Sequence, residues 1–457
     1  MNSRVDRRRF VKYVGAAAIA VGGAAAGYYL YDIGLARKTE VAAPTVTQTA
    51  TTVDYPPYAD FKYKPYYLCP TDQQTIEFTN MSYDLGGEPL TNTWLVDGNA
   101  VGRERDYLTK LPVGEHVVDL QVSDGKQARV KSATVTVEPD QIYPTKPLYV
   151  RYNGTSYFIG PMTPEWPTIP TPTREEMDEQ LDAIHDDLGC NAIILCGGKD
   201  DEDNIVECAK LAIAKGFQRV CVQPRYISAN VDETIESIGR FASKVRELRE
   251  SSETVVYCVG HEFTLETNVL GDSFWERYQV LKQGGGYDRI RAVLPEMFRR
   301  IIRVCGQGYG YPITYASLPI YEHDLVPWSN PIFESVGVNV YIQPLVGQTK
   351  DWCIDFLESV KRFRKPVHAT DWGVWSYEGA DQYGGWSPLY GSGRPYDESP
   401  QRRYIEEYCN MLNRARIDGC YWIQYNDTLE IGHELYNPRT RQRKQGFYMY
   451  KSYQRVS

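Results

Sequence analysis

Two carboxylates in the C-terminal part of the chain stand at equivalent places after apolar segments. Glu262 comes two residues after the run Thr254–Gly260, and Asp371 comes two residues after the run Pro366–Ala369. One carboxyl group of a pair can donate a proton while the other acts as a nucleophile or a base. Hydrolysis of a glycosidic bond requires such a pair. These two residues are therefore the first candidates for catalysis.

Other polar and aromatic residues stand at or just after apolar runs, and we expect them to contact a substrate. They are Arg225, His261, Asn339, Tyr341, Trp372, Trp422 and Tyr425. Each has a structural alternative. Glu262 can pair with Arg225, Asp371 can cap its loop, and Tyr341 and Trp422 can pack inside the fold.

The elements that must position these residues alternate between strands and helices. Thr173 and Glu176 form a capping box that opens a helix with one apolar face. Eight β-then-α units predict an α/β fold, a (β/α)8 TIM barrel over residues 145–457. A doubly wound open sheet is the rival, but no Gly-rich phosphate loop follows the first strand. The predicted strands are Ser156–Gly160, Asn191–Cys196, Arg219–Gln223, Thr254–Gly260, Ile313–Ser317, Val336–Tyr341, Pro366–Ala369 and Gly419–Gln424.

Residues 145–457 resemble the retaining (β/α)8 glycoside hydrolases of clan GH-A. In that clan an acid/base Glu follows strand four and a nucleophile Glu follows strand seven. Asn153–Gly160 is similar to the clan's opening strand, Lys365–Val367 leads into strand seven as it often does there, and Trp422 stands where a sugar-stacking Trp is common. The resemblance implies a carbohydrate substrate and no cofactor.

Two departures from the clan's pattern bear on the mechanism. His261 replaces the usual Asn before the acid/base residue, and Asp371 replaces the nucleophile Glu. An Asp side chain is shorter by about 1.5 Å. A retaining pair 5–5.5 Å apart would therefore widen to roughly 6.5–7 Å, near the lower edge of the inverting range. Glu262 is expected to be the general acid. Asp371 is expected to be either a nucleophile that lies further from the sugar than the usual Glu, or a general base.

A different outcome of the same departures is a barrel that kept the cleft and lost catalysis. Such a protein would bind carbohydrate or take part in cell-surface assembly. Glu378 and Glu430, in the loops after strands seven and eight, are the other carboxylates that could replace the missing Glu, although solvated loop charge is the simpler reading of each.

Residues 59–139 predict a small all-β domain that precedes the barrel. Its short alternating runs are separated by turn signals, which is typical of a β-sandwich. The order Phe78, Trp94–Gly98 and Gly114–Asp124 resembles the immunoglobulin-like polycystic-kidney-disease (PKD) domain. The resemblance implies a spacer or an adhesive arm without catalysis.

The N-terminus predicts export. Arg7 and Arg8, a variable residue, Phe10, an apolar residue and Lys12 precede an uncharged run, and this order resembles the twin-arginine signal. The run of 19 residues, Tyr13–Tyr31, is almost long enough to span a bilayer, so residues 1–36 are either a cleaved signal or an anchor helix at the cell membrane. Residues 37–58 are a Thr- and Pro-rich linker.

The composition narrows the possible partners. A net charge of −9 argues against a nucleic-acid partner, which would need a basic face. The ten cysteines include no Cys-x-x-Cys pair, and no His-x-x-x-His pair occurs, so no metal site is expected. Cys190, Cys196, Cys221, Cys258 and Cys420 are read as buried free thiols.

Overall fold

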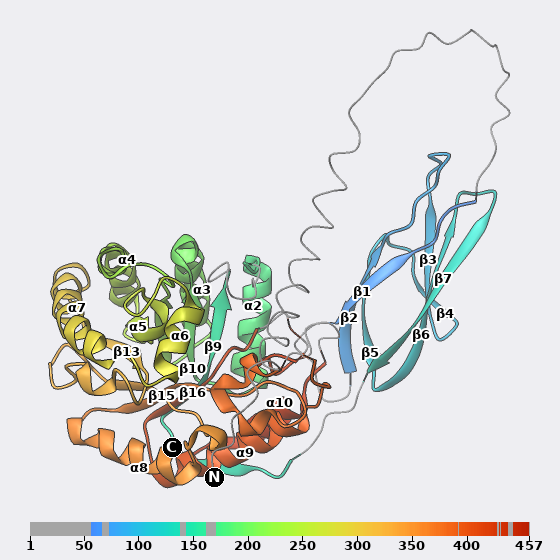
Figure 1. Ribbon diagram of the computed structural model, residues 1–457. Helices are drawn as coiled ribbons and strands as arrows, with labels where there is room; N and C mark the ends of the chain where they lie inside the picture. The colour runs from blue at the N-terminus through green and yellow to red at the C-terminus, as the bar shows by residue number, and fades with distance from the viewer. Residues whose placement is uncertain are drawn as a thin grey trace, which may run out of the picture. The chain divides into compact units, whose positions relative to one another are not determined.

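A computed structural model describes residues 56–65, 73–137, 143–160, 171–391, 393–426, 429, 431–436 and 442–456 (Figure 1). The expected signal or anchor at 1–36 and all but the last three residues of the linker lie outside these ranges. Within them, no helix is both long enough and apolar enough to cross a membrane.

Eight parallel strands close into a barrel, in chain order from β9 to β16. Each of the eight predicted strands coincides with one of them to within a few residues. The TIM barrel is therefore confirmed. The strands are β9 (Tyr152–Ile159), β10 (Ala192–Gly197), β11 (Arg219–Pro224), β12 (Val255–His261), β13 (Ile313–Ser317), β14 (Val336–Asn339), β15 (Val367–Trp372) and β16 (Gly419–Trp422).

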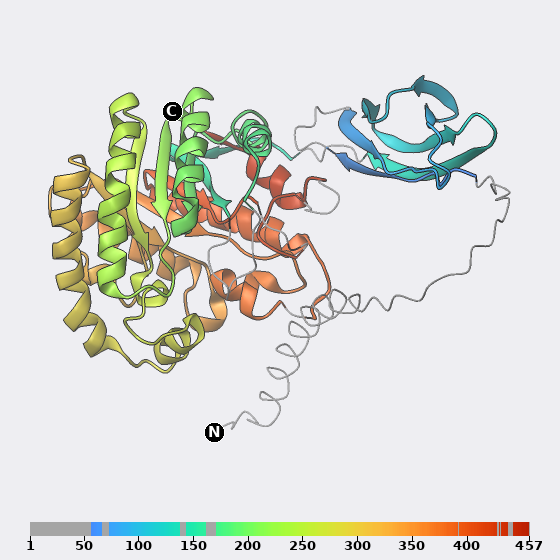
Figure 2. The same ribbon diagram turned by 90° about the horizontal axis from the view of Figure 1, so that it is seen from above.

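Helices between the strands surround the barrel. In Figures 1 and 2, α3, α4 and α7 lie side by side, and each packs against the next. The expected capping box of Thr173 and Glu176 opens α2. The helices are α2 (Arg174–Asp182), α3 (Glu202–Ala214), α4 (Val231–Ser251), α5 (Phe263–Glu266), α6 (Phe274–Lys282), α7 (Tyr287–Gly308), α8 (Lys350–Val360), α9 (Ser399–Ala415) and α10 (Gln445–Ser452).

Two apolar layers result from the alternation of side chains along the strands. A small cluster that includes Phe158, Ile194, Cys258 and Tyr421 is separate from a much larger one that contains the apolar faces of the helices. The cysteines predicted to be buried and free are buried and free. One short parallel pair joins β8 (Lys146–Leu148) to β17 (Tyr453–Arg455).

An all-β part precedes the barrel, as predicted. Its two antiparallel sheets have the strand orders β1-β2-β5 and β4-β3-β6-β7, and they share one apolar core around the fully buried Trp94. This arrangement is a β-sandwich. Its strands are β1 (Phe61–Pro65), β2 (Gln73–Asn80), β3 (Thr91–Val96), β4 (Asn99–Gly102), β5 (Tyr107–Pro112), β6 (Gly114–Ser123) and β7 (Ala128–Val137).

Candidate active site

One cavity of about 460 Å³ receives six of the nine side chains expected to do chemistry or bind substrate. Its volume lies in the range of small-molecule sites, roughly 300–1,000 Å³. The residues come from the C-terminal ends of β11, β12, β14 and β15, which is the face where TIM barrels build their sites. The six are Arg225, His261, Glu262, Asn339, Tyr341 and Asp371.

Glu262 is held in a tight left-handed turn between β12 and α5. Its φ is +40° and its ψ is 57°, a conformation that costs a non-glycine residue about 1–2 kcal/mol. The Glu262 backbone N–H donates to Ala316 O at 2.9 Å, and its carbonyl accepts from Leu265 N and Glu266 N. Gly260 allows the turn to close, since a Cβ there would lie 2.3 Å from the Phe263 ring.

Buried side chains of the neighbouring strand support this turn. The Phe263 N–H donates to the Tyr315 hydroxyl at 2.8 Å, and that hydroxyl donates to Glu322 Oε1 at 2.9 Å. The Thr264 N–H donates to the other carboxylate oxygen of Glu322 at 3.1 Å. Burial raises the pKa of Glu322 to about 7, although the Leu318 backbone N–H opposes the rise. Glu322 thus holds the backbone on which Glu262 sits.

Asp371 is placed by ordinary strand geometry. It lies in β15, where it pairs in register with Asn339 of β14, and it is 5% exposed. Its Oδ2 atom accepts a hydrogen bond from His261 Nε2 at 3.0 Å. Burial raises the pKa of Tyr341, and the charge of Asp371 and a hydrogen bond with its side chain add to the rise. His261 and Tyr341 therefore both hold the Asp371 carboxylate.

Asn339 links the two carboxylates. Its Oδ1 accepts from Thr370 Oγ1 at 2.8 Å, which orients its Nδ2. That Nδ2 donates to Glu262 Oε1 at 2.8 Å and lies 2.8 Å from His261 Nε2. Together with the His261–Asp371 contact, these steps limit the separation of the two carboxylate oxygens to about 8.6 Å, inside the ~10 Å limit of either hydrolytic mechanism.

His261 is the positive centre of the site. Burial and the neighbouring Arg225 lower the pKa of His261, but Glu262, Glu266 and Asp371 outweigh both and raise it to about 10. As an imidazolium, it donates from Nδ1 to Glu266 Oε1 at 2.9 Å and from Nε2 to Asp371. Arg225 completes the network, because its Nε donates to Glu266 Oε1 at 2.7 Å.

The electrostatic surroundings of Glu262 and Glu266 differ. Burial raises the pKa of Glu262, and the charges of Asp371 and Glu266 add to the rise, while His261 and the Asn339 amide oppose it. Burial also disfavours ionised Glu266, but Arg225 and His261 outweigh it and hold the pKa of Glu266 below its usual value. Glu262 is therefore suited to carry a proton, whereas Glu266 is a fixed negative charge.

Three of the expected substrate contacts lie elsewhere. Trp372 and Trp422 are fully buried, at 0% exposure, and meet edge to face with ring centroids 5.0 Å apart. Trp372 also stacks on Tyr408 at 4.2 Å. Tyr425 is buried against Tyr436. None of the three lines the cavity, and all three belong to the large apolar cluster.

Strand alternation explains this difference. Successive side chains of a strand point to opposite faces, so Asp371 faces the cavity and Trp372 faces the helices. By the same rule Trp422 points outward, and the next residue, Ile423, lines the cavity. The sugar-stacking position predicted at the end of the eighth strand is one residue out of phase with the cavity.

Several cavity residues were not anticipated from the sequence. Glu266 holds both His261 and Arg225, and the Gln343 and His433 side chains each have a buried polar atom without a hydrogen-bond partner among the described residues. His433 Nδ1 accepts from Trp375 Nε1 at 3.0 Å, so its unpartnered Nε2 is a donor. These residues lie in loops and in a short helix, where no periodic pattern marks them.

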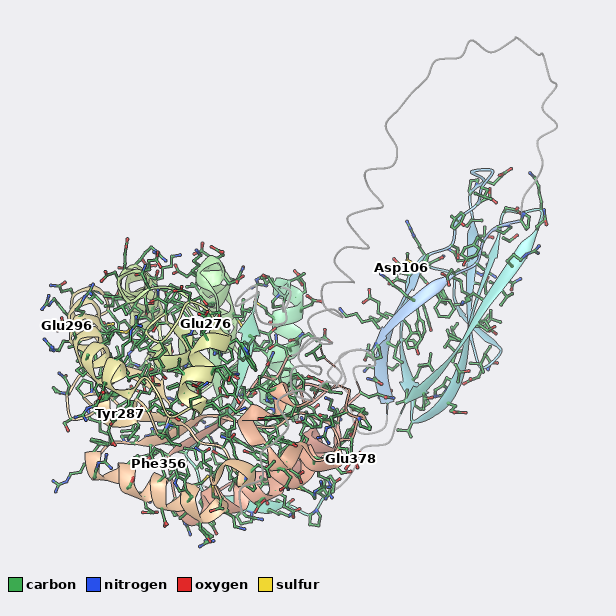
Figure 3. All side chains as sticks on the ribbon, viewed as in Figure 1. Asp106, Glu276, Tyr287, Glu296, Phe356 and Glu378 are labelled. Carbon is green, nitrogen blue, oxygen red and sulfur yellow. The ribbon has the colours of Figure 1, made fainter. Side chains whose placement is uncertain are left out.

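The other candidate groups stay outside the cavity or outside the described residues. Glu378 is exposed on the loop after β15 (Figure 3), and Glu430 is not among the described residues. Of the aromatic residues in that loop, Tyr383 lines the cavity and Tyr377 is buried. The described part of the chain contains no group of three His, Cys, Asp or Glu side chains that could hold a metal ion.

Comparison with known proteins assigns the chain to no family. No protein-family model matches the chain, and a search of curated proteins found no match. Among solved structures, a GH113 β-1,4-mannanase in a complex is 15% identical with a TM-score of 0.45; the match covers 66% of this chain and 98% of that one. A GH53 catalytic domain from Ignisphaera aggregans is 12% identical with a TM-score of 0.42, and the match covers 69% and 100% of the two chains.

The PKD1 domain of Vibrio anguillarum Epp matches a smaller part. It is 22% identical, with a TM-score of 0.17, over 19% of this chain and 100% of that one. Matches with these sequence identities and TM-scores carry no argument about the reaction.

Proposed function

We propose that the protein is a glycoside hydrolase in which Glu262 is the general acid and Asp371 is the nucleophile or the general base. The observation that carries this proposal is that both carboxylates line one cavity and each is held by a hydrogen bond, Glu262 by Asn339 and Asp371 by His261. The raised pKa of Glu262 supports the role of proton donor.

The reaction follows from the positions of the two groups. A sugar ring beside Asp371 places its glycosidic oxygen near Glu262, which transfers its proton to that oxygen as the carbon–oxygen bond breaks. In a retaining reaction, Asp371 attacks the anomeric carbon, and water later replaces it while Glu262 takes a proton back. In an inverting reaction, Asp371 takes a proton from the attacking water. The carboxylate oxygens of Glu262 and Asp371 are at most about 8.6 Å apart, which is compatible with both the retaining and the inverting reaction.

The test is a hydrolysis screen with the full-length protein. 4-Nitrophenyl glycosides of the common sugars, in both anomers, and β-1,4-linked polysaccharides are offered to the wild type and to Glu262→Gln. Proton NMR of the first-formed anomer then separates retention from inversion. We expect turnover by the wild type and a loss of roughly 10²–10⁴-fold in the variant on substrates with poor leaving groups.

Absence of turnover in a folded wild-type protein would contradict the proposal. If such a protein still bound oligosaccharides in calorimetry, the site would belong to a carbohydrate-binding protein that has lost catalysis.

We further propose that the barrel works outside the cytoplasmic membrane, either released or anchored. The support for this is the order of Arg7, Arg8, Phe10 and Lys12 before an uncharged run. Replacing both arginines, Arg7→Lys with Arg8→Lys, should leave the protein in the cytoplasmic fraction. Unchanged export of the double variant would contradict the proposal.

A further inference from the structure

One side of the cavity is built from aliphatic side chains, which form an apolar wall. The wall is defined here by Leu265, Leu281, Leu318, Pro319, Ile320 and Leu345. These side chains cannot exchange hydrogen bonds with the hydroxyl groups of a sugar. They also lack the flat aromatic faces that stack on sugar rings. The segments that carry them also supply Phe274, Tyr278 and Tyr321 to the lining, so this side of the cavity is mainly apolar.

The apolar wall lies on the side of the proposed proton donor. Leu265 belongs to the turn that begins at Glu262, and its backbone N–H donates to the Glu262 carbonyl at 2.8 Å. Leu318 follows β13, which pairs with the strand that carries Glu262. Because the general acid protonates the leaving oxygen, the leaving group begins beside Glu262. The wall thus occupies the region that the leaving group enters.

Contacts within the protein hold the wall in place. Tyr321 Oη donates to Leu281 O at 2.9 Å and ties the loop after β13 to α6. Leu265 and Leu281 are almost fully buried, at 2% and 4% exposure. A preformed apolar surface binds an apolar ligand without the cost of ordering loops first.

At its outer edge the wall is open to solvent. Ile320 is 57% exposed and Leu345 is 62% exposed, although both line the cavity. Exposed aliphatic groups that continue into a cavity are typical of a ligand-binding groove. The apolar surface therefore runs from Glu262 to the mouth of the cavity.

The carboxylate side of the cavity has the opposite character. Gln343 Oε1 and His433 Nε2 are buried and have no hydrogen-bond partner within the described ranges. Buried polar atoms of this kind are satisfied by a polar ligand, and sugar hydroxyl groups supply both donors and acceptors. The cavity thus has a polar end for a sugar and an apolar end for what is attached to it.

We infer that the substrate is a glycoside whose leaving group is an aliphatic chain, such as a long-chain alkyl or isoprenoid alcohol. This inference rests on the proposed function, because the direction of the leaving group follows from the role of Glu262. Hydrolysis then releases the free sugar and the aliphatic alcohol, with water as the second reactant.

The first experiment compares methyl, butyl and octyl glycosides of whichever sugar and anomer the screen identifies. Each methylene that leaves water for apolar surroundings strengthens binding roughly four-fold. Burial of only two or three added methylenes therefore predicts that kcat/KM for the octyl glycoside exceeds that for the methyl glycoside by at least ~10-fold. Equal values for the two, or a preference for oligosaccharides, would overturn the inference and leave the hydrolase proposal standing.

A pair of matched variants tests whether the wall causes the preference for the octyl glycoside. Leu345→Asn should reduce the octyl-to-methyl ratio about three-fold or more, because a polar group replaces part of the wall. Leu108→Asn is the control, since Leu108 is also exposed, at 55%, and lies on β5 of the sandwich. An unchanged ratio in Leu345→Asn, or an equal loss in both variants, would overturn the inference.

Calorimetry with 1-octanol gives a readout that does not depend on turnover. We expect 1-octanol to bind the wild type with a negative heat-capacity change and to bind Leu345→Asn more weakly. Binding of 1-octanol without hydrolysis of any glycoside would refute the proposed function while supporting an apolar binding site. Hydrolysis without binding of 1-octanol would refute the apolar leaving group alone.

Discussion

The turn that carries Glu262 and the strand end that carries Asp371 hold their carboxylates by different means. Glu262 sits in a left-handed backbone conformation and depends on the buried Tyr315 and Glu322 beneath it. Asp371 lies near the end of β15, where it pairs with Asn339. A strand end therefore positions a carboxylate at little cost, whereas the proton donor requires strain and a dedicated set of hydrogen bonds.

The largest expected difference between the two regions is chemical. A 2,4-dinitrophenyl leaving group departs without a proton, so Glu262→Gln should keep most of its kcat/KM on such glycosides while losing roughly 10²–10⁴-fold in kcat/KM on alkyl glycosides. Asp371→Asn should lose activity on both by about 10⁴-fold or more, because the nucleophile or base is needed in either case. Steady-state kinetics on the two substrate classes measures this split. Equal losses in Glu262→Gln on both classes would show that Glu262 is not the proton donor.

The next effect concerns the imidazolium that pairs with Asp371. The pKa of His261 is raised to about 10 in the folded protein, so its stabilising contribution is complete below about pH 6.5 and is lost as the pH rises toward 10. At ~1.4 kcal/mol per pKa unit, the wild type should lose as much as ~5 kcal/mol of unfolding free energy across this range. His261→Gln should remove the loss. Urea denaturation at several pH values measures it.

A second buried histidine provides the control for that experiment. Burial lowers the pKa of His323 to about 4, so it is neutral across the whole range. His323→Gln should leave the pH slope unchanged. A wild-type stability that is flat from pH 6.5 to 10 would show that His261 is not a cation in the folded protein.

A smaller effect tests the support beneath the Glu262 turn. Tyr315→Phe removes the hydroxyl between the Phe263 N–H and Glu322, which should cost about 1–3 kcal/mol of stability. It should also lower kcat on alkyl glycosides by about 10-fold, with little effect on dinitrophenyl glycosides, because only the proton donor shifts. Tyr257→Phe is the matched control, since its hydroxyl bonds to Ile238 O in α4, away from the cavity. Equal losses on both substrate classes would contradict a positioning role for Tyr315.

The smallest effect compares the backbones of the two regions directly. Glu262→Gly should have a free energy of unfolding about 1 kcal/mol above that of Glu262→Ala, because glycine accepts the left-handed conformation that costs other residues ~1–2 kcal/mol. Asp371→Gly should lie about 0.5–1 kcal/mol below Asp371→Ala, since glycine is unfavourable inside a strand. Each comparison is between two variants that lack the carboxylate, so chemical denaturation of the four variants measures the two signs. A Glu262→Gly variant no more stable than Glu262→Ala would mean that the turn is not strained.

Much of the fold was open to prediction because the signal is local. The β-branched and apolar runs that became β10 to β13 are short and bounded by turns, and some helices of the barrel, such as α2 and α4, begin with a capping box. The alternation of these two patterns is sufficient for a TIM barrel. The small sandwich could be predicted equally well, since alternate side chains of β6 and β7 point toward one core.

Only part of the site could be predicted from the sequence. Ends of parallel strands meet on one face of a barrel, and this rule brought Glu262 and Asp371 together with four of their expected neighbours. It did not reveal the burial of Glu322 or the contacts of Glu266, because both depend on loops that pack against distant strands. The sequence showed His261 only as an unusual residue before Glu262. The structure shows that His261 hydrogen-bonds to Asp371.

By itself, the sequence determined the order of the elements and therefore which residues end the barrel strands. Only the tertiary structure decided which of those side chains face the cavity, because the facing of a strand residue alternates with register and shifts at irregular pairings. Such irregularities occur between Val338 and Asn339 and between Ala369 and Trp372. Near these irregularities Asp371 and Ile423 line the cavity, whereas Trp372 and Trp422 are buried in the core.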